Sequence, residues 1–213
     1  MLRSHLRQAR AKSSTHSDLR DLGQGDLSPE RVEALADLSV TDASIMREHW
    51  PEIEVERRYH LIRHMIELMQ TDVSKDFERA LCVAASDPDV QNRRTAIRGL
   101  AEANSGRTVS TIVELLEREL DESVIRQILE TLGEIAQNAR LSEEQIDSMR
   151  TAMVHQAEHG SSAVIRREAL TAASALPADQ LLHDLVSAAY RSSNEADQVF
   201  AVRAMGRIGV SYW

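Results

Sequence analysis

Apolar residues recur at helical spacing along most of the chain. In residues 54–70, Leu61, Ile62, Met65 and Ile66 fall on one broad face of a helix. A stripe this wide predicts that neighbouring helices cover it on two sides. Shorter amphipathic helices are predicted at 29–38 and in a segment ending near residue 50, and further ones at 75–85, 108–120, 143–158 and 178–191.

Each of the last four segments is followed by a second helix of related pattern. These second helices are predicted over 92–100, 124–133, 165–173 and 199–206, and Leu100, Leu132, Ala173 and Met205 occupy equivalent places about 32 to 41 residues apart. One pair of helices cannot bury its apolar faces alone, so pair must stack on pair. The pattern predicts an all-α fold, an α-solenoid (superhelix) of stacked antiparallel helix pairs.

Turn and capping residues separate the predicted helices. Ser142 and Gln145 form a capping box, and Asp87-Pro88 is predicted to supply a cap and a helix-starting proline. Glycine inside a helix costs up to about 1 kcal/mol relative to alanine. The predicted helices nevertheless contain Gly99, Gly133 and Gly206, which predicts close packing at these positions.

The same boundaries define the predicted domain organisation. Residues 1–26 are polar, basic and without periodicity, and are predicted to form a flexible tail. Residues 27–213 are predicted to form one repeat domain. It comprises N-terminal helices over 27–72 and repeats at about 74–104, 107–138, 142–176 and 178–210.

The repeats resemble those of the HEAT family. The residues that carry the resemblance are Asp87-Pro88-Asp89-Val90 followed by Arg93, Ala96 and Gly99-Leu100, then Ile165-Arg166 with Ala169 and Ala172, and Ala204-Met205-Gly206. Arg126 lies one position off the usual register, and Gln198 stands where an arginine is expected. The front of the chain, with Trp50-Pro51 and Arg57-Arg58, is similar to bacterial HEAT-repeat proteins of unassigned function. The resemblance implies a HEAT-like (armadillo-like) solenoid.

Composition narrows the classes of partner. The net charge of −9 comes from 25 basic and 34 acidic residues, which disfavours nucleic acid because phosphate contacts need a basic surface. No apolar run approaches the ~18 residues of a membrane span, so no membrane association is expected and a cytoplasmic location is predicted. The single cysteine, Cys82, is predicted to be an inert core thiol.

One short motif suggests metal chemistry. His155, Glu158 and His159 match H-x-x-E-H, and two histidines at i and i+4 could chelate zinc. A catalytic zinc site needs a third protein ligand, and the sequence offers no evident one. We therefore expect a solvated helix end, with no metal site, no cofactor and no enzymatic activity.

The predicted function is a protein–protein interaction scaffold that binds another protein or a peptide on the concave surface formed by the second helices. The candidate contact residues are Arg94, Arg98, Glu130, Glu134, Arg167 and Arg203. Arginines at positions 93, 94, 98, 166 and 167 are alternatively expected to bridge to acidic residues of a neighbouring layer. HEAT-like proteins also include DNA glycosylases and proteins that resemble bilin lyases, so an enzyme or nucleic-acid-binding protein stays open as the alternative. The scattered aromatic residues disfavour base stacking.

The last predicted helix has no polar capping helix after it, although open solenoid ends normally need one. Three explanations stay open: Tyr212 and Trp213 cover the end, the chain is a fragment of a longer array, or the chain self-associates through this end.

Overall fold

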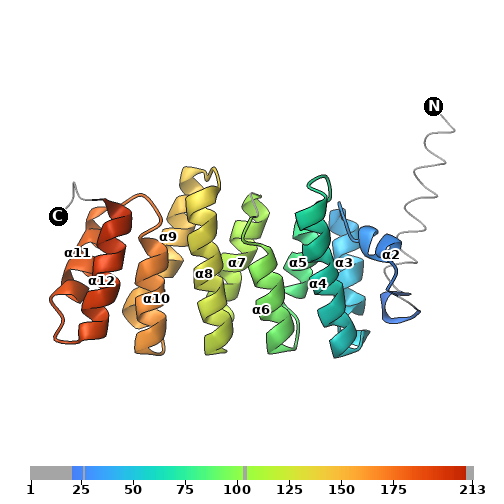
Figure 1. Ribbon diagram of the computed structural model, residues 1–213, viewed down its shortest axis with the longest axis horizontal. Coiled ribbons are helices and arrows are strands. Elements are labelled where there is room, and N and C mark those ends of the chain that lie inside the picture. The colour runs from blue at the N-terminus through green and yellow to red at the C-terminus, as the bar shows by residue number, and fades with distance from the viewer. Residues whose placement is uncertain (1–20, 26, 103–104, 210–213) are drawn as a thin grey trace. The chain divides into compact units, whose positions relative to one another are not determined.

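The computed structural model of the chain describes residues 21–25, 27–102 and 105–209 (Figure 1). Regular structure in these residues consists of helices, with no strand, which confirms the all-α prediction. Contacts divide the helices between two compact units, one ending at Gly99 and one beginning at Leu100. Within each unit, consecutive helices run in opposite directions and pack in pairs, as predicted (Figure 1).

The first unit is built around one long helix. Its elements are α2 (Pro29–Glu33), α3 (Val40–His49), the 3-10 turn η2 (Trp50–Glu52), α4 (Val55–Thr71), α5 (Glu78–Ala84) and α6 (Val90–Gly99). Leu61, Ile62 and Met65 of α4 are fully buried. Because α4 packs against α2 on one side and against α5 and α6 on the other, its wide apolar stripe is covered as predicted.

Residues 21–25 belong to the segment predicted as a tail. Asp21–Gly23 form a 3-10 turn, Leu22 is buried, and Arg57 of α4 donates hydrogen bonds to the carbonyl oxygens of Leu22 and Gln24 at 2.6 and 2.9 Å. Packing therefore begins before residue 27. Residues 1–20 and 26, the rest of the predicted tail, lie outside the described residues.

A buried carboxylate links three elements of the first unit. Asp87 Oδ2 accepts hydrogen bonds from Trp50 Nε1 and Arg58 Nε, each at 2.7 Å, and the side chain of Asp87 is fully inaccessible to solvent. The prediction that Asp87 caps a helix begun by Pro88 is wrong, because α6 begins at Val90 and the backbone N–H that Asp87 Oδ1 accepts, from Asp89 at 2.8 Å, lies before the helix. Asp89 caps α6 instead, accepting from the backbone N–H of Asn92 at 3.0 Å.

Two helices of the first unit are shorter than predicted. Helix α2 ends at Glu33, and turns follow as far as Asp37, which has a left-handed φ of 53° and donates its backbone N–H to the carbonyl oxygen of Asp76 at 2.7 Å. Helix α5 begins at Glu78, whose backbone N–H is held by the Asp76 carboxylate. Cys82 in α5 is half-buried, so the prediction of a core thiol is wrong in this respect.

The described residues of the second unit form three helix pairs. They are α7 (Gly106–Arg118) with α8 (Glu122–Asn138), α9 (Glu143–His159) with α10 (Ala163–Ala173), and α11 (Gln180–Tyr190) with α12 (Glu195–Ile208). The second helices α8, α10 and α12 are neighbours in a row, and α7 packs on α9. The predicted capping box of Ser142 and Gln145 is confirmed at the start of α9.

The three helical glycines differ in their surroundings. A Cβ on Gly99 would lie 2.7 Å from Ile66 Cγ1, so the predicted close packing is confirmed there. A Cβ on Gly133 would lie 3.5 Å from the Cα of Ala172, an ordinary contact between α8 and α10. For Gly206 the prediction is wrong as far as the described residues go, because none of their atoms lies within 4 Å of the added atom.

Among the described residues, none of the helices is long and apolar enough to cross a membrane.

Candidate partner-binding residues

The structure divides the six predicted contact residues between the units. Helix α6 of the first unit carries Arg94 and Arg98, and α8, α10 and α12 of the second carry Glu130 with Glu134, Arg167 and Arg203. Arg98, Glu130, Glu134 and Arg203 are exposed, whereas Arg94 and Arg167 are half-buried. The Arg94 Nε atom is buried and has no hydrogen-bond partner among the described residues.

Arginines of the second unit connect successive second helices. Arg126 of α8 pairs with Glu168 of α10 at 3.3 Å, and Arg167 of α10 pairs with Asp197 of α12 at 2.6 Å. The guanidinium of Arg167 holds the pKa of Asp197 below its ordinary value of 3.8. The expectation that such arginines bridge neighbouring layers is thus confirmed for Arg167, and Arg126 makes a second bridge that was not predicted.

The two glutamates of α8 form an exposed acidic pair, one helical turn apart. Gln127 Nε2 donates a hydrogen bond to Glu130 Oε2 at 3.2 Å. Partial burial, and then the negative charge of Glu130, raise the pKa of Glu134 above its ordinary value of 4.5. A cation placed beside the pair would relieve this repulsion.

A cleft of about 290 Å³, which we call the α10–α12 cleft, lies in the second unit. Its apolar lining comes from the end of α9 and from α10, α11 and α12: Ala157, Ala163, Leu170, Leu185, Ala189 and Phe200. Arg166, Arg167, Asn194 and Asp197 add polar groups. Several of these are engaged already, because Arg167 bonds Asp197 and Arg166 donates to the carbonyl oxygen of Gly160 at 2.8 Å.

One of the predicted contact residues lines this cleft, and a second lies close to one of its walls. Arg167 lines it directly, and the guanidinium carbon of Arg203 lies 5.6 Å from the ring centroid of Phe200, which also lines it. The glutamates of α8 and the arginines of α6 do not line it. Sequence reasoning missed Phe200, Leu170 and Leu185, because their helical spacing makes them look like ordinary core residues.

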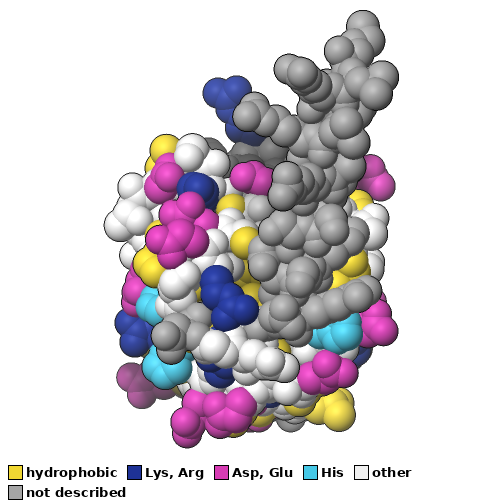
Figure 2. Space-filling model, turned by 90° about the vertical axis from the view of Figure 1, so that its right-hand side faces the viewer, with side chains coloured by type: hydrophobic (Ala, Val, Ile, Leu, Met, Phe, Trp, Pro, Cys, Tyr) yellow, Lys and Arg dark blue, Asp and Glu magenta, His cyan; other side chains and the backbone are white. Residues whose placement is uncertain are grey.

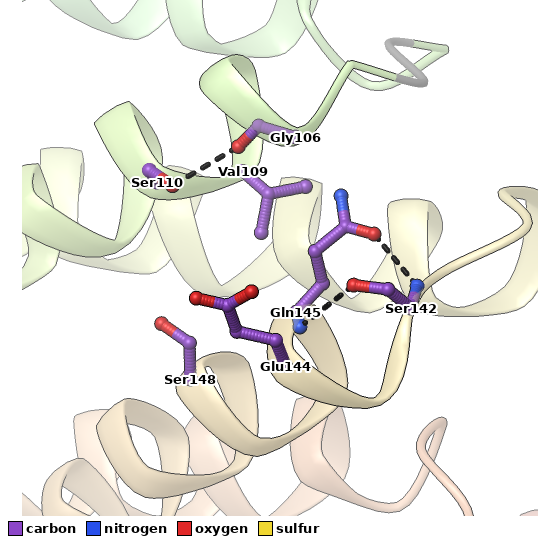
Figure 3. A pocket seen from close by; sticks show the side chains of 7 residues that line it. All are labelled: Gly106, Val109, Ser110, Ser142, Glu144, Gln145 and Ser148. Carbon is purple, nitrogen blue, oxygen red and sulfur yellow. Dashed lines mark hydrogen bonds between the residues drawn. The ribbon is translucent and has the colours of Figure 1, made fainter.

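A second hollow, of about 440 Å³, lies where α7 and α9 begin (Figure 3). Gly106, Val109 and Ser110 of α7 line one side, and Ser142, Glu144, Gln145 and Ser148 line the other. Most of its polar groups cap or complete helices: Ser142 and Gln145 bond each other as a capping box, and Ser110 Oγ donates to the Gly106 carbonyl oxygen at 3.0 Å (Figure 3). Glu144 supplies the one carboxylate that lines this hollow. The lining contains no nucleophile–base pair of the kind that an active site needs.

The predicted weak metal candidates lie at the exposed end of α9. The rings of His155 and His159 are 5.1 Å apart in an edge-on arrangement, and Glu158 lies 3.8 Å from His159. Over the part of the chain that the structure describes, no group of three or more His, Cys, Asp or Glu side chains is arranged to hold a metal ion. The position of the two histidines agrees with the prediction of a solvated helix end.

The distribution of surface charge and the burial of the aromatic residues are relevant to the alternative of nucleic-acid binding. On the face shown in Figure 2, outside the area drawn in grey, basic side chains are scattered among acidic ones and form no continuous patch. Trp50 and Phe77 are buried in the first unit, so their rings cannot stack on bases. These features do not favour the nucleic-acid alternative.

Within each unit the helix pairs pack in rows. This arrangement is the one that defines all-helical repeat proteins. Residues 78–159 match the family model of HEAT repeats. The resemblance to HEAT repeats that the sequence motifs predicted is therefore confirmed over this stretch. No curated protein matches the chain.

The chain is similar to two designed repeat proteins of known structure. A designed armadillo repeat protein in complex with the peptide (KR)4 is 16% identical, with a TM-score of 0.48, and the match covers 97% of this chain and 86% of that one. A computationally designed armadillo repeat protein for modular peptide recognition is 17% identical, with a TM-score of 0.47 and coverage of 95% and 94%.

Proposed function

We propose that this chain is a non-enzymatic binding scaffold whose partner is another protein or a peptide. The observation that carries the proposal is the α10–α12 cleft, which has an apolar lining and a polar rim between two successive helix pairs. Its volume of about 290 Å³ lies at the lower end of small-molecule pockets, and suits an apolar side chain of a partner segment better than a cofactor.

The rim is suited to orienting such a segment. Arg167 is held in place by Asp197, and Arg203 lies over Phe200, so both arginines are positioned before a partner arrives. Preorganised groups lose less conformational freedom on binding. We further propose that Arg94 and Arg98 in the first unit, and Glu130 and Glu134 in the second, also contact the partner, within a repeat domain of residues 27–213. Each proposed repeat contains one observed helix pair.

A blocking substitution at the cleft tests this function. Ala163 is exposed, lines the cleft and is the first residue of α10, where a glutamate suits the helix dipole and should not disturb folding. Photo-crosslinking from a probe at Arg203, in lysate of the source cells, should capture a protein with the wild-type chain and lose it with Ala163→Glu.

Val40→Glu is the matched control, because Val40 is likewise exposed at the first position of a helix, α3. It should leave capture unchanged. Equal capture by all three proteins would contradict the proposal. Co-purified nucleic acid, or stoichiometric zinc that disappears in a His155→Ala/His159→Ala variant, would instead support the alternative of an enzyme or nucleic-acid-binding protein.

A further inference from the structure

The α10–α12 cleft offers hydrogen-bond donors beside its apolar lining. Arg167 uses its Nε atom for Asp197, and its Nη1 and Nη2 atoms have no hydrogen-bond partner among the described residues. Arg166 uses only Nη1, for the carbonyl oxygen of Gly160. Because both arginines line the cleft, guanidinium N–H groups remain there for a ligand to use.

The carboxylate of this lining, Asp197, has both of its oxygens engaged. Oδ1 accepts from Arg167, and Oδ2 accepts from the hydroxyl group of Ser192 at 2.9 Å. Asn194 adds a donor, because its Oδ1 atom accepts from the backbone N–H of Ala196 while its amide nitrogen has no partner in the part of the chain that the structure describes. With two arginines and one paired carboxylate, the lining carries one positive charge in excess. It therefore favours an anionic group that accepts hydrogen bonds.

The apolar wall of the cleft lies one helical turn from these donors. Leu170 follows Arg166 and Arg167 by four and three residues, so the three side chains lie on one face of α10. Phe200 of α12 likewise follows Asp197 by three residues. The volume of about 290 Å³ holds about ten non-hydrogen atoms, which is the size of one apolar residue. A ligand that fills the cleft must therefore carry its anionic group and its apolar group within the span of a single residue.

The end of a polypeptide chain presents these two groups together. Its last residue carries the terminal carboxylate and the side chain on the same Cα atom. In an extended segment, neighbouring side chains point to opposite sides, and those on one side are about 7 Å apart. An acidic and an apolar side chain of such a segment are therefore too far apart to fill a cleft of this size together.

We propose that the α10–α12 cleft binds the C-terminal end of a partner polypeptide, with the terminal carboxylate on Arg166 and Arg167. The partner's last side chain, about the size of leucine, packs on the apolar lining of the cleft. This binding mode rests on the scaffold function proposed above and specifies which end of the partner the cleft receives. Basic residues earlier in the partner's chain agree with the net charge of −9, because they lie outside the cleft.

Pools of synthetic peptides test this binding mode on the full chain. Each peptide has several varied positions, drawn without Asp and Glu, followed by a leucine. The first pool ends in a free carboxylate and the second in an amide. The third also ends in an amide, and has a glutamate two positions before the leucine. The immobilised chain should retain free-acid peptides about tenfold better than either amide pool, as measured by mass spectrometry.

Substitutions in the cleft test the role of the carboxylate. Ala163→Gln and Ala163→Glu add side chains of nearly the same size at the exposed first position of α10, so a much larger loss with glutamate reports repulsion of an anion. Arg166→Gln should weaken the best free-acid peptide about tenfold and leave its amide form unchanged. The control is Arg140→Gln, which removes an exposed arginine between α8 and α9 and should change neither. Circular dichroism melts confirm that each variant is folded.

Equal retention of the free-acid pool and the first amide pool would overturn this binding mode, and so would equal losses with Ala163→Gln and Ala163→Glu. Preferred retention of the pool with the internal glutamate would overturn it as well, and would assign the cleft to an acidic side chain. If the crosslinking test captures a protein that Ala163→Glu releases, while the pools show no preference for free acids, the scaffold function stands and the C-terminal contact fails. If no protein is captured and no pool is retained, both fail.

Discussion

Gly99 lies where side chains of two neighbouring helices approach the backbone of α6. An added Cβ would lie 2.7 and 2.8 Å from Ile66 Cγ1 and Cδ1 and 3.2 Å from Leu81 Cδ1. Overpacking costs about 1–3 kcal/mol, and the helix-propensity gain of at most about 1 kcal/mol offsets part of it. Gly99→Ala should therefore destabilise the protein by about 1 kcal/mol and lower its melting temperature by about 2–4 °C.

Gly133 supplies the matched comparison for this substitution. Its added Cβ would make ordinary contacts of 3.5 and 3.6 Å with Ala172, so Gly133→Ala should keep or raise the melting temperature. Gly133→Leu extends well beyond that contact and should lower the melting temperature. Equal melts for the alanine variants of Gly99 and Gly133 would contradict the packing described around α6.

At the scale of elements, the ion pair between Arg167 and Asp197 connects α10 to α12. Because the pKa of Asp197 is lowered in the folded protein, its stabilisation is fully present above the ordinary value of 3.8 and is lost as pH falls through the lowered pKa. At neutral pH, Asp197→Asn should reduce the free energy of unfolding by about 1 kcal/mol. Urea unfolding should show this difference shrinking as the pH is lowered below 3.8.

The control for this experiment is Asp147→Asn, which removes an exposed ion pair to Arg150 within α9. Pairs of this kind contribute about 0–1 kcal/mol, so a much smaller effect is expected at neutral pH. An Asp197→Asn difference that stayed constant down to the lowest pH would mean that the loss does not come from the charge of Asp197.

The helices were predictable from sequence because their apolar spacing is regular, and their ends were less so. The capping box at Ser142 follows from local sequence alone, and the structure has it. The cap of α6 could not be assigned from local sequence. Asp87 accepts hydrogen bonds from Trp50 and Arg58, which lie 37 and 29 residues away in sequence. The α10–α12 cleft was missed for the same reason: its lining comes from four helices that only packing brings together.

At the scale of the whole molecule, the excess of acidic residues makes a basic partner electrostatically favourable. The net charge is −9, and the pKa of Glu134 is raised by burial and by its neighbour Glu130, so a nearby cation would stabilise this pair. Glu130→Lys/Glu134→Lys should weaken binding of the partner captured at the α10–α12 cleft by about tenfold, mainly at low ionic strength.

A second double variant separates a local contact from general attraction. Glu114 and Glu117 are exposed on α7, a first helix, and Glu114→Lys/Glu117→Lys changes the net charge by the same amount. If the partner contacts the second helices, titrations should show a large loss of affinity for the α8 variant and a small one for the α7 variant. Equal losses would mean that net charge steers the partner and that Glu130 and Glu134 are not part of the contact.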